Sequence, residues 1–459
     1  MNIAPEIFKA YDIRGIIGKN LTAETAYQIG RALATEAASL NVECIAVARD
    51  GRLSGPELAT HLIKGITDSG INVIDAGMLT SPMLYFTAIR HCGGSGIMIT
   101  GSHNPPDYNG FKMMLKGDTL GGERVQNLLH LIQQNRLNNS DQKGTVSELA
   151  PAEEYLNYIA SHVKLKRPMR VAIDAGNGIA GAFTGDLYRL LGCDVTELFC
   201  EVDGNFPNHH PDPAKAENLQ DLIQVLRDGD CELGLAFDGD GDRLGVVTRE
   251  GNIIYPDRQL MLFAQDALSR NAGATIIYDV KSGRKLRSWI EQHGGVPMMA
   301  KTGHSFIKKA MQEHNGIVGG EMSGHIMLAE NWFGFDDGPY AGARLLEILS
   351  AYTDPSAVLN SLPESLSTPE LHIDLPADSD GHHVIAELAV VAQFDGAEEI
   401  NTLDGMRVEY ADGFGLVRAS NTTPVLVLRF EADNDAALER IQNQFKTLIN
   451  TNPRLAWPL

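Results

Sequence analysis

The sequence predicts an α/β protein with three successive α/β domains, built on mixed or parallel sheets, and a smaller C-terminal α+β domain. Three observations predict this fold. The chain has 459 residues, which suggests about three or four domains when a domain has roughly 100–200 residues. The succession strand, helix, strand occurs three times along the chain. Closely spaced strands then replace it in the last part of the sequence.

The first strand–helix–strand unit shows in residues 42–74. Residues 42–48 form a mainly apolar run with β-branched side chains, as in a buried strand, and the charged turn Arg49-Asp50-Gly51-Arg52 follows it. Ser54 and Glu57 form a predicted capping box at the start of a helix. Residues 71–74 predict the next strand, so a parallel sheet covered by helices is expected.

The same pattern returns in residues 171–237 and in residues 275–318. Near the end, short strands at 408–410, 416–418 and 425–430 precede an amphipathic helix. That order predicts an antiparallel sheet with helices on one face. Stretches at 164–168, 251–256 and 362–369 read as linkers, and the predicted domains are 1–150, 151–252, 253–364 and 365–459.

The charge of the chain excludes some partners. There are 38 Lys and Arg against 59 Asp and Glu, a formal net charge of −21. Such an acidic surface repels polyanions, so nucleic acid and anionic membranes are not expected partners. An anionic substrate would need a local cluster of cations. The chain is expected to be a monomer or a weak dimer.

The five cysteines and the N-terminal residues predict a compartment. The cysteines are scattered and form no C-x-x-C pair, so neither a disulfide framework nor a cysteine zinc site is indicated. Residues 1–14 already carry four charged side chains and resemble no signal peptide. No apolar stretch approaches the roughly 18 residues of a membrane span. A cytoplasmic location is expected.

The segment Asp238-Gly239-Asp240-Gly241-Asp242-Arg243 predicts a metal site. Three carboxylates at alternate positions repel one another unless a cation neutralises them, and the glycines let the backbone fold around it. The calcium-loop pattern fails, because Arg243 stands where that loop needs glycine. Mg²⁺ fits better, since it leaves positions open for phosphate oxygens. The alternative is an acidic turn at the end of a strand.

The segment Thr100-Gly101-Ser102-His103-Asn104-Pro105 offers a nucleophile candidate, Ser102, just after an apolar strand. Open α/β sheets present reactive groups at such strand ends. The segment does not match the G-x-S-x-G elbow of hydrolases. Read alone, the segment favours a Ser-Asn-Pro turn that only reverses the chain.

Three more polar loops follow predicted strands. Residues 302–305 and 319–325 bring hydroxyl, imidazole and carboxylate groups that suit sugar hydroxyls. Residues 418–424 place Arg418 beside hydroxyls and an amide, as in a phosphate cradle. Structural histidines and a polar hairpin turn are the alternatives. Arg14, Lys112, Arg243 and Lys281 could supply the local positive field.

Together these motifs make the chain resemble the α-D-phosphohexomutase superfamily, most of all its bacterial phosphomannomutase/phosphoglucomutase branch. The resemblance covers essentially the whole chain, although each motif alone would be weak. It implies a four-domain, heart-shaped protein whose active site lies in a central cleft. The motifs, in the order of the family, are YDIRG (11–15), TGSHNP (100–105), DGDGDR (238–243), DVKSG (279–283), KTGHS (301–305), GEMSGH (320–325) and RASNTTP (418–424).

The resemblance also implies roles for individual residues. Ser102 would carry a phosphoryl group, and Mg²⁺ would be held by that phosphoserine with Asp238, Asp240 and Asp242. Lys112 and His325 are the expected proton carriers. The other expected catalytic residues are Arg14, His103 and Arg243. The expected substrate-binding residues are Tyr11, Lys281, His304, Glu321, Ser323, His325, Arg418, Ser420, Asn421, Thr422 and Thr423.

The implied reaction moves a phosphoryl group between C1 and C6 of glucose and mannose phosphates. It passes through a phosphoserine and a 1,6-bisphosphate, with glucose 1,6-bisphosphate as intermediate and activator, and the fourth domain is expected to hinge. GEMSGH together with RASNTTP argues against glucosamine phosphate. Two alternatives stay open: a metal-dependent sugar phosphatase, and a catalytically silent sugar-phosphate-binding protein.

Overall fold

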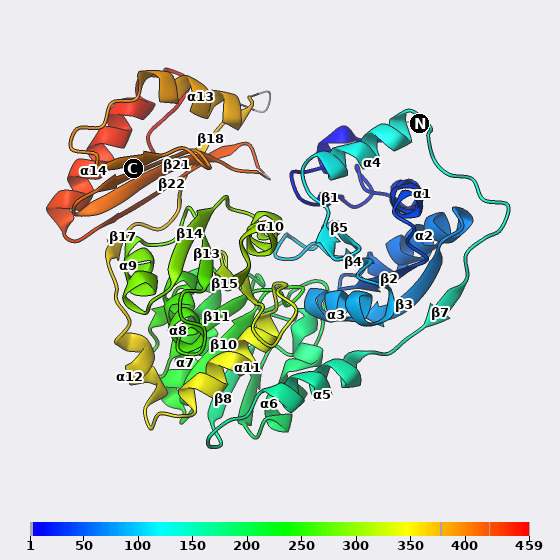
Figure 1. Cartoon of the computed structure of the whole chain (residues 1–459), viewed down its shortest axis with the longest axis horizontal. Helices are drawn as coiled ribbons and strands as arrows, with labels where there is room; N and C mark the ends of the chain where they lie inside the picture. The colour runs from blue at the N-terminus through cyan, green and yellow to red at the C-terminus, as the bar shows by residue number, and fades with distance from the viewer. Residues whose placement is uncertain (1–2, 377–378, 422, 459) are drawn as a thin grey trace. The chain divides into compact units, whose positions relative to one another are not determined.

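The computed structural model describes residues 3–376, 379–421 and 423–458. The chain divides into two compact units. Unit 1 comprises Met1–Gln259 and Ser323–Ser361, and unit 2 comprises Leu260–Met322 and Leu362–Leu459. The described residues form four β-sheets separated along the chain, which confirms the four-part α/β organisation (Figure 1).

The first sheet of unit 1 has the strand order β1-β5-β4-β2-β3-β7, with β6 paired to β5. Strands β4, β2, β3 and β7 are parallel, as expected, whereas β1, β5 and β6 run antiparallel to their neighbours. The strands are β1 (Ile13–Ile16), β2 (Cys44–Arg49), β3 (Asn72–Met78), β4 (Gly96–Ile99), β5 (Tyr108–Leu115), β6 (Asp118–Thr119) and β7 (Val146–Glu148).

Five helices accompany this sheet, and two of them pack unusually closely. A Cβ at Gly30 would lie 2.4 Å from the carbonyl oxygen of Leu62, and one at Gly65 would lie 2.2 Å from that of Tyr27. Only glycine allows this approach of helix to helix. Figure 1 shows the two helices, α1 and α2, side by side. The helices are α1 (Ala23–Ser39), α2 (Gly55–Asp68), α3 (Ser81–His91), α4 (Glu123–Gln133) and α5 (Ala152–His162).

The capping box predicted at Ser54 and Glu57 is wrong. Helix α2 begins where expected, but Ser54 has a helical backbone (φ −80°, ψ −12°) and its side chain caps no backbone N–H. Its hydroxyl instead accepts a hydrogen bond from Asn109 Nδ2 at 2.9 Å. The tertiary contact with β5 therefore takes the side chain that local capping would have used.

The second sheet of unit 1 has the order β12-β11-β10-β8-β9. Strands β8, β9 and β10 are parallel, and β11 and β12 extend the sheet in antiparallel fashion. The elements are β8 (Arg170–Asp174), β9 (Asp194–Leu198), β10 (Leu233–Phe237), β11 (Leu244–Thr248), β12 (Ile253–Ile254), α6 (Thr184–Leu190) and α7 (Gln220–Asp228). Unit 1 also contains β16 (Ile326–Leu328), α11 (Gly338–Leu349) and α12 (Pro355–Asn360).

In unit 2, β14, β13 and β15 lie side by side and parallel. The following sheet is antiparallel, with β22 pairing β17, β18 and β21 and with β20 between β21 and β19. The elements are α8 (Pro256–Leu268), which continues from unit 1, β13 (Thr275–Asp279), α9 (Arg284–Gln292), β14 (Val296–Ala300), α10 (His304–His314), β15 (Gly316–Gly320), β17 (Leu366–Ser367), β18 (Leu371–Asp374), α13 (Gly381–Val391), β19 (Glu399–Asn401), β20 (Met406–Tyr410), β21 (Gly413–Ala419), β22 (Val425–Ala432) and α14 (Asp435–Ile449).

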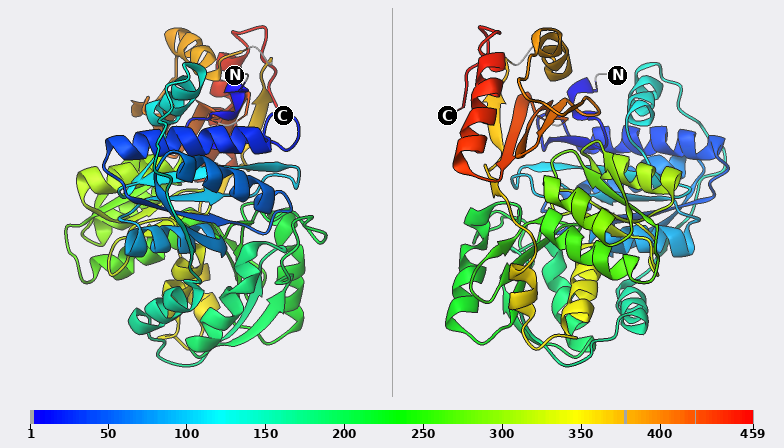
Figure 2. Two further views of the ribbon diagram at one scale, coloured as in Figure 1. Left: turned by 90° about the vertical axis from the view of Figure 1, so that its right-hand side faces the viewer. Right: turned by 60° about the vertical axis from the view of Figure 1, so that its left-hand side comes forward.

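The expectation of helices on one face of the last sheet is confirmed. Leu388 of α13 and Phe445 of α14 belong to one apolar core with Val417 and Leu428 of the sheet. Phe414 and Leu416 face the opposite side, where they meet Val280. Figure 2 shows α14 lying along the strands. Within the described part of the chain, no helix combines the length and apolar character that crossing a membrane requires.

Candidate active site

The Ser102 loop and the charged turn after β2 lie at one edge of the first sheet. Strands β2 and β4 are parallel neighbours, with Arg49 opposite Ile99, so the segments after their carboxyl ends meet. The carboxylate of Asp50 accepts hydrogen bonds from Thr100 Oγ1 at 2.7 Å and from the N–H of Gly101 at 3.3 Å. The turn after β2 therefore fixes the start of the nucleophile loop.

Arg52 holds the rest of this loop. Its side chain is buried, with 0% exposure, and pairs with Asp50 through Nε at 3.3 Å. A Cβ at Gly101 would lie 2.4 Å from the guanidinium carbon, so the loop needs glycine there. The guanidinium donates to the carbonyl oxygens of Ser102 (2.8 Å), Asn104 (2.6 Å), Pro105 (2.6 Å) and Tyr108 (2.9 Å).

Ser102 itself adopts a left-handed backbone conformation, with φ 47°. This conformation is uncommon for a residue other than glycine, and at a functional site the surrounding contacts hold it. Its N–H donates to Thr100 Oγ1 at 2.7 Å. Its hydroxyl donates to Asp238 Oδ2 at 2.9 Å and lies 3.2 Å from His103 Nδ1. The nucleophile candidate and the acidic segment, 136 residues apart, are therefore in direct contact.

The acidic segment is the turn between β10 and β11. Gly241 has φ +77°, and a Cβ at Gly239 would lie 2.3 Å from the carbonyl oxygen of Ser102. Glycines between the carboxylates therefore let the turn pack directly on the nucleophile loop. The N–H groups of Asp242 and Arg243 donate to Asp238 Oδ1 at 3.1 and 3.2 Å, which closes the turn.

Asp238, Asp240 and Asp242 form a buried cluster that suits a hard cation. Each has 0% exposure and offers one oxygen, and these oxygens all lie within 4.8 Å of one another. Oδ1 of Asp240 and Oδ1 of Asp242 are buried without a hydrogen-bond donor among the described residues. Burial and the two neighbouring carboxylates raise the pKa of Asp238 well above its usual range. An oxygen-only donor set of this charge fits Mg²⁺.

Lys112 is the cation closest to this cluster. Its Nζ lies 2.6 Å from Asp240 Oδ2 and 2.5 Å from Asp242 Oδ2. Burial lowers the pKa of this amine, but the carboxylates of Asp240 and Asp242 outweigh burial and raise it well above the usual range. For Asp240 the effects are reversed: burial raises the pKa of this carboxyl group, but Lys112 outweighs burial and brings it below the usual range. In this arrangement Lys112 is a charged donor.

Arg243 and His325 meet in unit 1 next to the acidic turn. Arg243 Nε donates to His325 Nε2 at 3.3 Å. Because a guanidinium N–H can only donate, Nε2 is an acceptor and the ring proton lies on Nδ1. His325 Nδ1 in turn lies 3.2 Å from Asp336 Oδ2 and 3.5 Å from Asp242 Oδ1. This arrangement fixes the orientation of the imidazole beside the acidic turn.

Arg14 and His103 complete the unit 1 site. Arg14, on β1, forms hydrogen bonds with the side chains of Asn104 and Asp12. Burial and the cations Arg243 and Arg14 hold the pKa of His103 well below its usual range, so its ring is neutral at pH 7. Tyr11 precedes β1 and is partly buried. The structure therefore places Arg14, His103, Lys112, Arg243 and His325 around the Ser102 loop and the acidic turn beside it.

In unit 2, three predicted loops share one sheet edge, because β14, β13 and β15 are parallel. Lys281 follows β13 and pairs with Glu370 at 2.6 Å. His304 is the first residue of α10, after β14. Glu321 follows β15, and its Oε1 accepts a hydrogen bond from the N–H of Gly303. Ser323, from the same sequence motif, belongs to unit 1.

The predicted phosphate loop begins with the last two residues of β21, Arg418 and Ala419. Arg418 is 4% exposed, and its Nε donates to Asp404 Oδ2 at 2.9 Å. Its Nη2 is buried without an acceptor among the described residues, as expected of a group that awaits an anion. Ser420 Oγ and Thr423 Oγ1 lie 2.9 Å apart, and Asn421 Nδ2 donates to the carbonyl oxygen of Thr302 at 3.3 Å. Thr422 lies outside the described residues.

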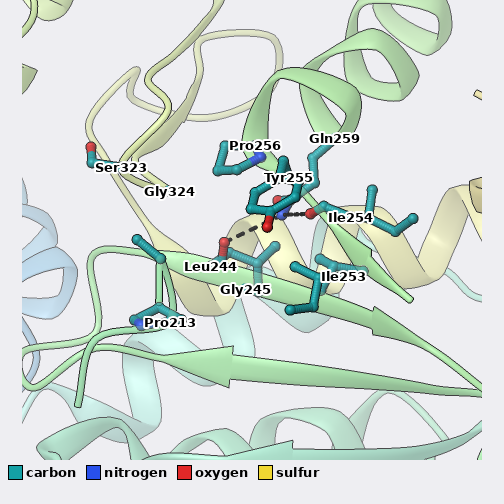
Figure 3. Close-up of a pocket in the computed structure, with 12 residues that line it drawn as sticks. Pro213, Leu244, Gly245, Ile253, Ile254, Tyr255, Pro256, Gln259, Ser323 and Gly324 are labelled. Carbon is teal, nitrogen blue, oxygen red and sulfur yellow. Dashed lines mark hydrogen bonds between the residues drawn. The ribbon is translucent and has the colours of Figure 1, made fainter. Parts of the chain in front are cut away.

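Ser323 and Gly324 also line a small pocket, which Figure 3 shows. Its other lining residues are mostly apolar; they come from β11, β12, the start of α8 with Tyr255 before it, and the segment that contains Pro213 and Ala214. Gln259 Nε2 donates to the carbonyl oxygens of Ile254 at 2.8 Å and Leu244 at 3.4 Å. None of the 12 lining residues carries a positive charge, so this pocket does not suit a phosphate.

Several residues that shape these sites belong to no motif in the sequence. Asp50 and Arg52 were visible as a charged turn, but the loop they hold lies about fifty residues away. Ser81 donates to Asp240 from the start of α3, and Asp336 orients His325. In unit 2, the carboxylate of Asp404 accepts hydrogen bonds from both Arg418 Nε and the N–H of Thr302. Only the side-by-side placement of distant segments shows these contacts.

Four domain families match consecutive parts of the chain. Residues 5–139, 153–251 and 255–366 match the alpha/beta/alpha domains I, II and III of phosphoglucomutase/phosphomannomutase. Residues 373–448 match the C-terminal domain of the same family. Together these matches cover most of the chain.

Relatives match over nearly the full length. A phosphoglucomutase of Neisseria meningitidis serogroup A is 66% identical over 458 residues, covering 100% of both chains. A phosphomannomutase/phosphoglucomutase of Pseudomonas aeruginosa is 54% identical, covering 96% of this chain and 94% of its own. The crystal structure of a phosphoglucomutase/phosphomannomutase family protein from Burkholderia thailandensis has 51% identity and a TM-score of 0.95, covering 100% of both chains.

Proposed function

The chain belongs to the phosphoglucomutase/phosphomannomutase family, and we propose that it interconverts the 1- and 6-phosphates of glucose and mannose. The relatives named above carry the names of both activities. The reaction is a reversible intramolecular phosphoryl transfer through a phosphoserine and a 1,6-bisphosphate. The observation that carries this proposal is the contact between the Ser102 hydroxyl and Asp238, 2.9 Å apart, inside a cluster of three buried carboxylates.

We propose that Ser102, once phosphorylated, and the three carboxylates hold Mg²⁺. The donor set fits such an ion, because it consists of oxygen atoms and two of those atoms are buried without a hydrogen-bond donor in the described structure. When bound, the ion supplies charge neutralisation at the transferring phosphoryl group. Glucose 1,6-bisphosphate is the proposed activator, because it phosphorylates Ser102.

The residues around Ser102 have separate proposed tasks. Arg52 and Asp50 hold the loop so that the hydroxyl points at the acidic turn. Lys112 and Arg243 bring positive charge to the phosphoryl group, and Arg14 and His103 lie beside the loop. Lys112 and His325 are the proposed proton carriers: one takes the proton of the attacking sugar hydroxyl, and the other supplies a proton to the Ser102 oxygen that leaves.

The proposed substrate-binding residues of unit 2 are Lys281, His304 and Glu321, together with the loop after β21. Arg418 suits the phosphate that does not react, since it is a buried guanidinium with a free donor in the described structure. Ser420, Asn421 and Thr423 add neutral hydrogen-bond donors, which do not require one particular orientation of the sugar ring. Such a loop could accept the sugar phosphate in both orientations, as a mutase requires.

The decisive experiment is Mg²⁺-dependent conversion of glucose 1-phosphate, and separately of mannose 1-phosphate, to the 6-phosphates. A trace of glucose 1,6-bisphosphate primes Ser102. Conversion of both sugars is expected, without accumulation of inorganic phosphate. Release of phosphate at the rate of substrate loss would show a phosphatase. If the substrate is neither converted nor hydrolysed, the chain is a binding protein.

The sequence-based expectations of a cytoplasmic location and of a monomer or weak dimer stay predictions. So do the four domain boundaries, although the second sheet extends to Ile253–Ile254, just beyond the second predicted boundary. Gel filtration with light scattering measures the oligomeric state directly. A mass near 49.8 kDa corresponds to the monomer.

A further inference from the structure

Cys44 and Cys92 lie in contact in unit 1. Their Sγ atoms are 2.7 Å apart although the residues are 48 positions apart in the sequence. The sulfur atoms of a disulfide are separated by about 2.05 Å, so a small approach would suffice to join them. The other three cysteines are also free thiols, and they lie elsewhere in unit 1.

The fold places this pair at the amino-terminal edge of the first sheet. Cys44 is the first residue of β2, and Cys92 is the residue that ends α3 just before β4. Ala46 pairs with Gly96, and the N–H of Ala46 donates to the carbonyl oxygen of Ser95 at 3.0 Å. The pairing of β2 with β4 therefore fixes both backbones around the two thiols. Ser102 follows the opposite, carboxyl end of β4.

The two thiols differ in exposure and in acidity. Cys44 is half-buried, whereas Cys92 is only 6% exposed. A hydrogen bond from Cys92 lowers the pKa of the Cys44 thiol, against the opposing effect of burial. That hydrogen bond and burial raise the pKa of the Cys92 thiol. The accessible cysteine is thus also the one with more thiolate, which is the reactive form.

We propose that Cys44 and Cys92 form a reversible intrachain disulfide by exchange with a low-molecular-weight disulfide. The Cys44 thiolate attacks one sulfur of the small disulfide, forms a mixed disulfide and releases one thiolate. Cys92 then loses its proton to solvent, attacks Cys44 Sγ and releases the second thiolate. Two protein thiols are oxidised to one disulfide, and one small disulfide is reduced to two thiols.

The experiment incubates the reduced full chain with glutathione disulfide at pH 8, followed by alkylation, digestion and mass spectrometry without reduction. The expected product is a peptide pair joined through Cys44 and Cys92, lighter by two hydrogen atoms than the free peptides. Dithiothreitol should reverse it. Because the cross-link closes a long loop, the oxidised protein should unfold at a temperature several degrees higher than the reduced protein.

Three variants separate the role of Cys44, which attacks the small disulfide, from that of Cys92, which resolves the mixed disulfide. C44S should give neither a cross-link nor a mixed disulfide at position 92, and C92S should stop at the mixed disulfide on Cys44. C200S is the matched control, because Cys200 is also half-buried but has no cysteine partner in the described structure, and it should cross-link like the parent. A stable mixed disulfide on Cys44 of the parent protein, or alkylation of both cysteines after oxidation, would overturn the proposal.

Discussion

Ser102 combines a reactive position with a backbone conformation that it would not adopt alone. Its φ of 47° is maintained by contacts to Thr100, Arg52 and the acidic turn. Strain of this kind persists at functional sites because neighbouring groups over-determine the backbone. At the residue scale, the site therefore depends on one nucleophile and on a few side chains that hold it in place.

Ser102→Ala should reduce turnover of glucose 1-phosphate by at least about 10³-fold, because the nucleophile is lost. Binding of glucose 1-phosphate should stay within a few-fold of the parent value, since the phosphate-binding groups remain. Coupled kinetics and titration calorimetry measure the two effects. Ser161→Ala, at an exposed helix position, is the control. Near-normal turnover by the Ser102 variant would contradict the assignment of the nucleophile.

Arg52→Lys should lower kcat by about 10- to 100-fold with little change in KM, because an amine cannot replace a guanidinium that holds four carbonyl oxygens. The slow step should be phosphorylation of Ser102, which single-turnover kinetics with glucose 1,6-bisphosphate measures. Arg31→Lys is the matched control, since Arg31 donates to a carbonyl oxygen at the surface. An unchanged kcat would show that the loop keeps its shape without Arg52.

Arg418→Ala should raise KM for glucose 1-phosphate by about 10- to 100-fold, since one charge-assisted phosphate contact is worth about 1.5–3 kcal/mol. Steady-state kinetics against substrate concentration give the value. Arg440→Ala removes an exposed guanidinium paired with Asp412 and should leave KM unchanged. If the KM of the Arg418 variant equals that of the Arg440 variant and of the parent protein, the loop that begins at Arg418 binds no substrate phosphate.

At the element scale, strand ends determine where the chemistry lies. The acidic turn joins β10 to β11, the nucleophile loop follows β4, and the charged turn follows β2. Each segment is short and leaves a buried strand, so its backbone position is fixed by the sheet. Helix ends contribute too: Ser81 at the start of α3 bonds Asp240, and Asp337 caps α11 while accepting the Tyr155 hydroxyl.

Asp337→Asn should change how stability depends on pH. Burial raises the pKa of Asp337 to about 7, against hydrogen bonds from Tyr340 and Tyr155. Because the pKa of this carboxyl group is higher in the folded than in the unfolded state, its contribution to the free energy of unfolding is fully present below about pH 4. That contribution is lost as the pH rises toward 7. Asparagine keeps the cap to the N–H of Tyr340 without a charge. The variant should therefore lose less stability than the parent between pH 4 and pH 7.

Urea unfolding of the full chain at several pH values tests this prediction, and the difference should reach a few kcal/mol. Asp354→Asn is the matched control, because Asp354 caps α12 from an exposed position. Parallel pH profiles for the parent and the Asp337 variant would contradict a raised pKa at that carboxyl group.

At the scale of the whole molecule, an acidic protein must concentrate cations where an anion binds. The net charge is −21, yet buried or partly buried cations gather in both units. Arg14, Lys112 and Arg243 surround the Ser102 loop in unit 1. Arg418 and Lys281 belong to unit 2. Local fields of this kind override the repulsive background over the length of a sugar phosphate.

Mg²⁺ should bind unit 1 alone, because Ser102 and the three carboxylates all belong to it. Hydrogen exchange with mass spectrometry should show slower exchange in residues 100–104 and 238–243 when Mg²⁺ is added, and unchanged exchange in β21 and β22. Chelation should abolish turnover. Asp240→Asn should remove the effect on exchange, and an equal effect in that variant would place the metal elsewhere.

Local sequence patterns suffice to predict the α/β class, the strand–helix succession and the loops that carry chemistry. Burial of one face of a helix gives an apolar repeat of about 3.6 residues, and burial of both faces of a strand gives a short continuous apolar run, so both can be recognised within a short stretch of sequence. The spacing of Asp238, Asp240 and Asp242 with intervening glycines likewise indicates a cation site before any contact is known. The motifs taken together indicated the family as well.

Tertiary structure alone decided which distant segments meet. Strands β1 and β5 were not predicted, yet their antiparallel pairing with the sheet carries Arg14 and Lys112 to the nucleophile loop. Arg52 and Ser54 look like ordinary turn and cap residues, and each bonds a partner about fifty residues away. Register between strands depends on burial across the whole sheet, so no local pattern could assign these contacts.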